Sequence, residues 1–306
     1  MKGTIAKAVI CAALGNIVWG FSFLFTRVGL NVAPNPNVML SHRFLMSALF
    51  MGFSVLIGKA KVSLKGKNWK PLAILLVTQI GYYVFETYGL LYTNTTIAGM
   101  VLAVAPVVTI GTGALFLKEY PTRRQALFCI MPVAGVIIMT ISGKELGVVT
   151  TIGIVLLLLT VLDSAVFKTA NRKAAEEFSA FERTFFVLSL SATFFTLVAL
   201  NSVGWDVKAY IAPMLDIKYL LAVLCLSLFC SIVANLLVNY AAGIMSAFKL
   251  ASFGSLSTLC SMLAGVVFLK EPVNLSLLFG AVLILVGIRQ VTKPPKPKYR
   301  RDEGEW

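Results

Sequence analysis

The sequence predicts an all-α integral membrane protein with ten transmembrane helices arranged as two inverted five-helix repeats. Three observations lead to this fold class: the apolar composition, the spacing of apolar windows and an internal duplication. Of the 306 residues, 58% are hydrophobic and 13% are charged, and the mean hydropathy is +0.87. A soluble domain carries about 25% charged residues. We therefore expect this chain to lie in a bilayer, where about 20 residues form one span.

Ten apolar windows follow one another along the chain and are separated by short gaps. They cover residues 5–28, 38–58, 71–92, 95–117, 122–142, 150–171, 184–203, 217–240, 246–268 and 273–291. Pro71, Pro121 and Pro272 stand where the first turn of a helix tolerates a missing N–H, and the residues around Pro36 predict a turn. Because the gaps are short, neighbouring helices are expected to be antiparallel.

Basic residues gather on one side of the predicted spans. With a cytoplasmic N-terminus, 20 of the 27 basic residues fall on the inner side. The outer side receives only Lys144, Lys208, Lys218 and Lys270. This imbalance follows the positive-inside rule. The sequence therefore predicts a multi-pass protein of the cell membrane with both termini cytoplasmic and an outward loop near Lys144. The N-terminal apolar stretch is expected to remain as the first span.

The chain also contains an internal duplication. Residues 113–119 read GALFLKE and residues 265–271 read GVVFLKE, a displacement of 152 residues that also carries Gly135 onto Gly287. A unit of five helices is odd in number, so its second copy enters the membrane inverted, as in many secondary transporters. The alternative is that FLKE is merely a common helix end. The expected units are a first repeat over 1–148, a second over 149–291 and a basic cytoplasmic tail over 292–306 that is drawn to anionic lipid.

Several short motifs occur in a characteristic order along the chain. They are Trp19-Gly20 with Phe21 and Phe23, Arg43-Phe44, Tyr88-Gly89-Leu90 with Tyr92-Thr93, Pro106 in AVAPVVT, and the Leu-Lys-Glu ends at Glu119 and Glu271. Over about residues 5–290 the chain resembles the EamA family of the drug/metabolite transporter superfamily, which has Leu-Gly-Glu at those ends. The resemblance implies a ten-helix exporter or importer of small metabolites. Asp163-Ser164 departs from the apolar or aromatic pair usual in that family, and the ninth span has no proline matching Pro106.

Charged residues within the predicted spans mark a candidate substrate site. Glu86 and Asp163 are the two of the thirteen acids that fall well inside spans, and Arg43 lies at a depth similar to that of Glu86. A charge in the hydrocarbon costs at least about 2.5 kcal/mol, so such groups normally face an internal cavity. Arg43 and Glu86 are therefore expected to be able to meet. A permanent pair would be structural, whereas a pair opened by substrate would be a gate.

Further polar and aromatic residues recur at helical spacing on several spans. Gln79, Tyr82, Tyr83 and Glu86 share one helix face, and residues 227, 231, 235 and 239 are spaced at intervals of four. The candidate substrate-binding residues are Asn16, Trp19, Arg43, Gln79, Tyr82, Tyr83, Glu86, Asp163, Asn235 and Asn239. Charges of both signs beside π faces suit an amphoteric or cationic solute, such as an amino acid or a drug-like amine. The serines are interpreted as simple helix contacts, and His42 is interpreted as incidental.

No motif for an enzyme or a pump is found in the sequence. There is no GxxxxGK[ST] loop, no HExxH pair and no CxxC pair, so we expect no catalytic residue, cofactor or nucleic-acid partner. The sequence favours a secondary transporter driven by a gradient. Asp163 has no basic residue one helical turn away, which predicts proton coupling, unless Arg43 or Lys249 neutralises it permanently. A membrane-embedded enzyme and a solute sensor are the alternative functions.

Overall fold

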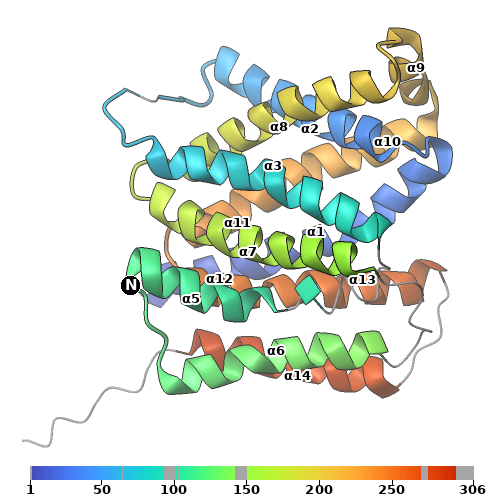
Figure 1. The fold of residues 1–306 in the computed structure, drawn as a ribbon. Helices are drawn as coiled ribbons and strands as arrows, with labels where there is room; N and C mark the ends of the chain where they lie inside the picture. Colours follow the sequence, from blue (N-terminus) through green and yellow to red (C-terminus); the bar gives the residue numbers. More distant parts are fainter. Residues whose placement is uncertain are drawn as a thin grey trace, which may run out of the picture.

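A computed structural model describes residues 2–63, 65–92, 101–102, 104–141, 150–269 and 275–293. Within these ranges the regular secondary structure is entirely helical. The helices run side by side along one common direction and form a bundle (Figure 1). The predicted all-α class is therefore confirmed for this part of the chain.

Most helix bounds agree with the predicted windows to within a few residues. The exceptions are the window 95–117, in which α5 begins only at residue 105, and the window 246–268, which is divided between α12 and α13. The first half contains α1 (Lys2–Val32), α2 (Pro36–Leu56), α3 (Lys70–Leu91), α5 (Ala105–Leu117) and α6 (Arg123–Ile141). The second half contains α7 (Thr151–Ala174), α8 (Ala180–Ser202), α9 (Val207–Ile211), η1 (Ala212–Leu215), α10 (Ile217–Cys225), η2 (Leu226–Val233), α11 (Ala234–Ala242), α12 (Ala247–Ser252), α13 (Gly254–Leu269) and α14 (Leu275–Thr292). Lys144, Glu271, Pro272 and the chain after Lys293 lie outside the described residues.

Several of these helices have the dimensions of membrane spans. Five described helical segments are long and apolar enough to cross a bilayer by length and composition. They are Gly3–Val32, Pro36–Leu56, Thr151–Ala174, Ala180–Ser202 and Ile217–Ala242. Shorter apolar helices cover Ala105–Leu117 and Leu278–Thr292. This pattern is that of a multi-pass membrane protein.

Local sequence signals explain where most helices begin. The Asn35 side chain accepts hydrogen bonds from two backbone amides and caps α2, with Pro36 in its first turn. Pro71 occupies the first turn of α3 in the same way, as the sequence predicts. The expectation for Pro121 is wrong, because Pro121 precedes α6, which begins at Arg123. Pro106 lies in the first turn of α5, where a backbone N–H would have no intrahelical acceptor and its absence costs no hydrogen bond.

Helices from the two halves of the chain pack against each other. α3 packs along α7, α2 along α8 and α6 along α14, while α1 contacts α10, α11 and α13. Close approach requires glycine at the α6–α14 contact, since a methyl group on Gly135 would lie 2.6 Å from the carbonyl oxygen of Gly280. Gly287 packs against Pro132 of α6 in the same interface. The largest buried apolar cluster joins side chains of α1, α6, α11, α13 and α14.

The long helix between Ile217 and Ala242 changes its pitch in the middle. Residues 226–233 form a π-helical segment, η2, between the α-helical segments α10 and α11. The Trp19 indole Nε1 donates a hydrogen bond of 2.9 Å to the carbonyl oxygen of Cys230 within this segment. Such widened turns occur often at functional sites. Here the segment faces α1 and α2, which carry three of the candidate residues: Asn16, Trp19 and Arg43.

Candidate functional site

Arg43 on α2 is held by hydroxyl groups from two other helices. Its side chain is buried, and its Nε donates to the Ser231 Oγ of η2 at 2.7 Å. Its Nη1 donates to the Ser22 Oγ of α1 at 3.2 Å. The serine contacts leave the positive charge without a carboxylate, because no ion pair within 4.0 Å involves Arg43 among the described residues. Sequence reasoning did not single out Ser22, and it interpreted Ser231 as a helix contact.

Glu86 on α3 bonds within its own helix rather than to Arg43. The Tyr82 hydroxyl donates a hydrogen bond of 2.9 Å to the Glu86 Oε1. Arg43 and Glu86, which the sequence analysis expects to be able to meet, form no ion pair within 4.0 Å in this structure. The two groups are nevertheless near enough for their charges to attract each other. The guanidinium and the carboxylate are therefore each bonded to other groups.

Asp163 on α7 points its carboxylate at the backbone of α3. A methyl group built on Gly81 would lie 3.2 Å from the Asp163 Oδ1, so the carboxylate packs tightly against the backbone of α3 at this glycine. The buried Oδ2 has no hydrogen-bond partner in the described part of the chain. Lys168, on the same helix, donates to the Ser164 Oγ at 2.8 Å. Neither Lys168 nor Arg43 nor Lys249 forms an ion pair with Asp163 in the described residues.

The tyrosine pair of α3 connects these charged groups. Tyr82 carries the hydroxyl that binds Glu86, and it lies near enough to Asp163 for the two groups to interact electrostatically. Tyr83 turns toward α2 and α8, with its ring centroid 5.2 Å from that of Phe44 and 6.0 Å from that of Phe195. Gln79 is buried on the same helix, beside Tyr83. The predicted face of α3 therefore lies at the contact with α2, α7 and α8.

The remaining predicted residues bind groups of the protein itself. The Asn16 Nδ2 donates to the Ala12 carbonyl oxygen at 2.7 Å, and the Asn235 Nδ2 donates to the Ser231 carbonyl oxygen at 2.6 Å. Both donors are thus bonded one turn back on their own helices. Trp19 is bonded to η2, as described above. These three residues lie on α1 and α11, which both contact the η2 segment that bonds to Arg43. Their role in binding stays a prediction.

Asn239 belongs to a separate buried polar network. Its Oδ1 accepts from the Asn171 Nδ2 at 2.7 Å, and its Nδ2 donates to the Thr184 Oγ1 at 2.8 Å. The Arg183 guanidinium donates to the main-chain oxygens of Asn171 and Asn239 at 3.0 and 2.6 Å. This network joins α7, α8 and α11. The polar residues spaced four apart between 227 and 239 therefore do not form one continuous face. Ser231 bonds to Arg43, whereas Asn239 bonds to residues of α7 and α8.

His42 is packed more firmly than the sequence suggests. Its side chain is buried, its Nδ1 lies 3.0 Å from the Tyr219 hydroxyl, and its ring centroid lies 4.6 Å from that of Tyr210. The Tyr210 hydroxyl in turn hydrogen-bonds with Ser41 at 2.7 Å. His42 thus ties α2 to α9 and α10, next to the site but on another face of α2.

Comparison with known proteins identifies the family to which this arrangement belongs. Residues 6–141 and 151–292 match the family model described as the EamA-like transporter family. The chain belongs to the EamA-like transporter family. The resemblance inferred from the sequence motifs is therefore confirmed.

Relatives of this EamA-like protein carry transporter names. It is 33% identical over 294 residues to the uncharacterized transporter YcxC of Bacillus subtilis (strain 168), covering 94% of this chain and 93% of that protein. It is 24% identical to the uncharacterized transporter YvbV of the same organism, over 92% and 90% of the two chains. A solved crystal structure shares its fold, with a TM-score of 0.76 and 17% identity over 94% of this chain and 96% of that one.

Family membership and helix composition together establish the general role of the chain. It is a membrane transporter of the EamA-like family, built from several apolar helices. Among the described residues, no three histidine, cysteine, aspartate or glutamate side chains are grouped so that they could hold a metal ion. The candidate site presents a guanidinium, two carboxyl groups and tyrosine rings.

Proposed function

We propose that this EamA-like transporter is a secondary carrier of a small amphoteric organic solute, of the amino acid or drug-like amine class. The observation that carries the proposal is the separation of charge between Arg43 and the two carboxyl groups of Glu86 and Asp163. Arg43 is bonded only to serine hydroxyls, and neither carboxyl group has a cationic partner among the described residues. The carboxylate of an amphoteric solute would pair with Arg43, and its ammonium group would pair with the carboxyl groups.

The chemistry of these groups matches such a solute. A guanidinium binds a carboxylate through charge-assisted hydrogen bonds, which are the strong ones. An ammonium group is attracted by a carboxylate and by the faces of aromatic rings. Tyr82 and Tyr83 meet edge to face with ring centroids 5.5 Å apart, and Tyr82 holds Glu86. An apolar part of the solute would contact these rings.

Alternating access between two inverted repeats is part of the proposal. The helix pairs support it, because the third helix of each proposed repeat packs on the first helix of the other: α3 on α7, and α10 and α11 on α1. The second helices, α2 and α8, and the fifth helices, α6 and α14, pack on each other. Gly135 and Gly287, 152 residues apart, both lie in the α6–α14 contact. A pseudo-twofold axis in the membrane plane would produce this pattern.

We further propose that transport is coupled to protons through Asp163. A buried charge without a partner is unfavourable, and intramembrane acids often serve in proton relays. The Asp163 Oδ2 lacks a partner in the described residues, and Lys168 is bonded to Ser164 instead. A proton taken up together with the solute would remove the uncompensated charge.

The proposed orientation in the cytoplasmic membrane places both termini inside. The labelled N-terminus and the connection between α2 and α3 lie at the same end of the bundle (Figure 1). That connection carries Lys59, Lys61, Lys65 and Lys67. The positive-inside rule supports a cytoplasmic position for this end.

Counterflow in proteoliposomes tests the proposed function. Candidate solutes are first selected from amino acids, amines and nucleosides by thermal shift, since a bound ligand stabilises the fold by mass action. Vesicles loaded with the unlabelled solute should then accumulate the labelled solute transiently from outside. A sensor would bind the solute without exchanging it, and an enzyme would change it chemically. Either of these results would overturn the proposal.

A further inference from the structure

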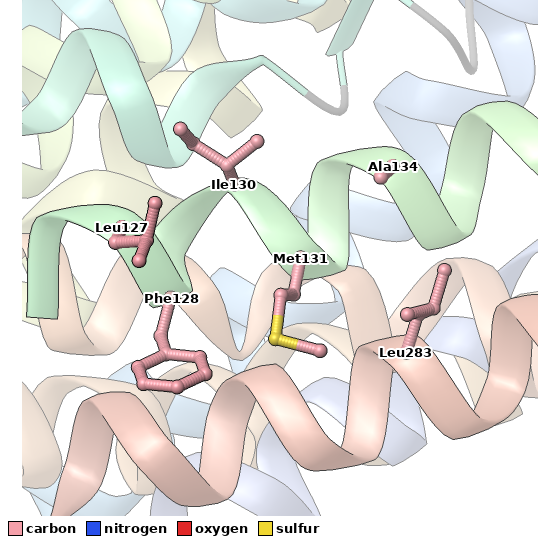
Figure 2. A pocket seen from close by; sticks show the side chains of 6 residues that line it. All are labelled: Leu127, Phe128, Ile130, Met131, Ala134 and Leu283. Carbon is pink, nitrogen blue, oxygen red and sulfur yellow. The ribbon is translucent and has the colours of Figure 1, made fainter. Parts of the chain in front are cut away.

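An apolar groove with a basic end runs between α6 and α14. The groove has a volume of about 320 Å³. It is lined by Leu127, Phe128, Ile130, Met131, Ala134 and Leu283. Figure 2 shows Phe128 and Met131 extending from α6 toward α14 and Leu283 extending from α14 toward α6. The two helices that line the groove, α6 and α14, lie on the side of the bundle away from α2 and α3 (Figure 1).

Basic residues continue the same two helix faces beyond the groove. Arg123 and Arg124 precede Leu127 and Phe128 by four residues, so each lies one helical turn above a lining side chain. The Arg124 guanidinium lies 5.7 Å from the Phe128 ring centroid. It also donates to the Gln290 side-chain oxygen of α14, so the basic end spans both helices.

The positive charge at this end has no negative partner in the described part of the chain. The side chains of Arg123, Arg124, Arg289 and Lys293 are exposed. Neither α6 nor α14 contains an aspartate or glutamate. The ion pairs in the described ranges involve other residues. The described residues therefore leave these basic groups open to an anionic partner.

We propose that this groove binds an anionic glycerophospholipid, with one acyl chain between α6 and α14 and the phosphate at the basic end formed by Arg123, Arg124, Arg289 and Lys293. An apolar channel that ends in arginines has the same polarity as such a lipid. Basic pockets between membrane helices on the cytoplasmic side bind anionic headgroups in this way. Exposed Leu127 and Ile130 face the hydrocarbon, where an acyl chain is the available apolar partner. The site is independent of the proposed substrate site.

Native mass spectrometry of the purified full-length protein tests this site. The probes are dioleoyl phosphatidylglycerol, dioleoyl phosphatidylcholine and glycerol 3-phosphate, which lacks acyl chains. Wild-type protein should retain phosphatidylglycerol in preference to phosphatidylcholine and should not retain glycerol 3-phosphate. The variant Arg123→Gln/Lys293→Gln should bind phosphatidylglycerol roughly 30-fold more weakly, at about fivefold for each basic residue near the surface. Neither side chain forms a hydrogen bond or ion pair with a described residue, so the fold is expected to persist.

A matched control separates a site from general surface charge. The variant Lys61→Gln/Lys65→Gln removes two exposed charges from the connection between α2 and α3. It should bind phosphatidylglycerol like the wild type. Ala134→Phe, which fills the groove, should weaken phosphatidylglycerol binding while leaving the melting temperature of the lipid-free protein unchanged. Equal retention of the two lipids would overturn the proposal, as would equal losses in the two charge variants. A dimer that covers the groove would also overturn it.

Discussion

Tyr82 contacts one carboxyl group of the candidate site and lies near the other. Its hydroxyl donates to Glu86 at 2.9 Å, and it lies beside Asp163 across the α3–α7 contact. The same residue therefore orients one carboxyl group and neighbours the other. Arg43 approaches from α2 without bonding to either.

Removing the Tyr82 hydroxyl is expected to weaken transport without unfolding the protein. Tyr82→Phe keeps the ring but leaves Glu86 without its donor, and a hydrogen bond to a charged group contributes about 1.5–3 kcal/mol. The KM for exchange should rise at least about tenfold. Tyr88→Phe, an exposed tyrosine on the same helix, is the matched control. A Tyr82→Phe protein with the wild-type KM would contradict this prediction, because it would show that Glu86 binds the solute without the Tyr82 hydroxyl.

Asp163 is expected to carry the coupling to protons. Asp163→Asn keeps the shape of the side chain but can no longer bind and release a proton. It should still exchange solute at equilibrium, while its net flux should no longer respond to an imposed pH gradient. Glu177→Gln, at an exposed glutamate between α7 and α8, should leave the response intact. If wild-type net flux were already indifferent to the gradient, the coupling proposal would fail and the transporter assignment would remain.

At the scale of helices, the sequence predicts much of the fold and less of the site. Composition and apolar windows place the helices well, because lipid exposure requires long apolar runs. The choice of hydrogen-bond partners depends on packing between distant segments. The sequence predicts similar depths for Arg43 and Glu86 within their spans. In the structure, however, Arg43 bonds to serines and Glu86 bonds to Tyr82. Nothing in the sequence indicates the π-helical segment η2, which carries Ser231.

The network around Arg183 is expected to stabilise the contact between α7, α8 and α11. Asn239→Ala removes partners from Asn171 and Thr184, and each buried polar group left unpaired costs about 1–3 kcal/mol. The melting temperature should fall by at least about 4 °C. Asn201→Ala, at the exposed end of α8, should change it little. An unchanged melting temperature for Asn239→Ala would instead favour the predicted role of Asn239 in substrate binding.

At the scale of the whole molecule, the two ends of the bundle should face opposite compartments. α9 lies at the end of the bundle opposite the labelled N-terminus (Figure 1). On a background without the five native cysteines, Lys208→Cys in α9 should react with an impermeant maleimide in intact cells. Lys144→Cys should do the same, whereas Lys65→Cys should react only after permeabilisation. The reverse labelling pattern would contradict the proposed orientation.

The central claim is that the solute lies between Arg43 and the two carboxyl groups. Counterflow of an amino acid and of its decarboxylated amine through wild type, Arg43→Gln and Glu86→Gln tests it most directly. Arg43→Gln should lose exchange of the amino acid and keep exchange of the amine, because only the carboxylate needs the guanidinium. Glu86→Gln should lose both while its melting temperature stays close to that of the wild type. Equal losses of both solutes in Arg43→Gln, or wild-type exchange in Glu86→Gln, would contradict the account.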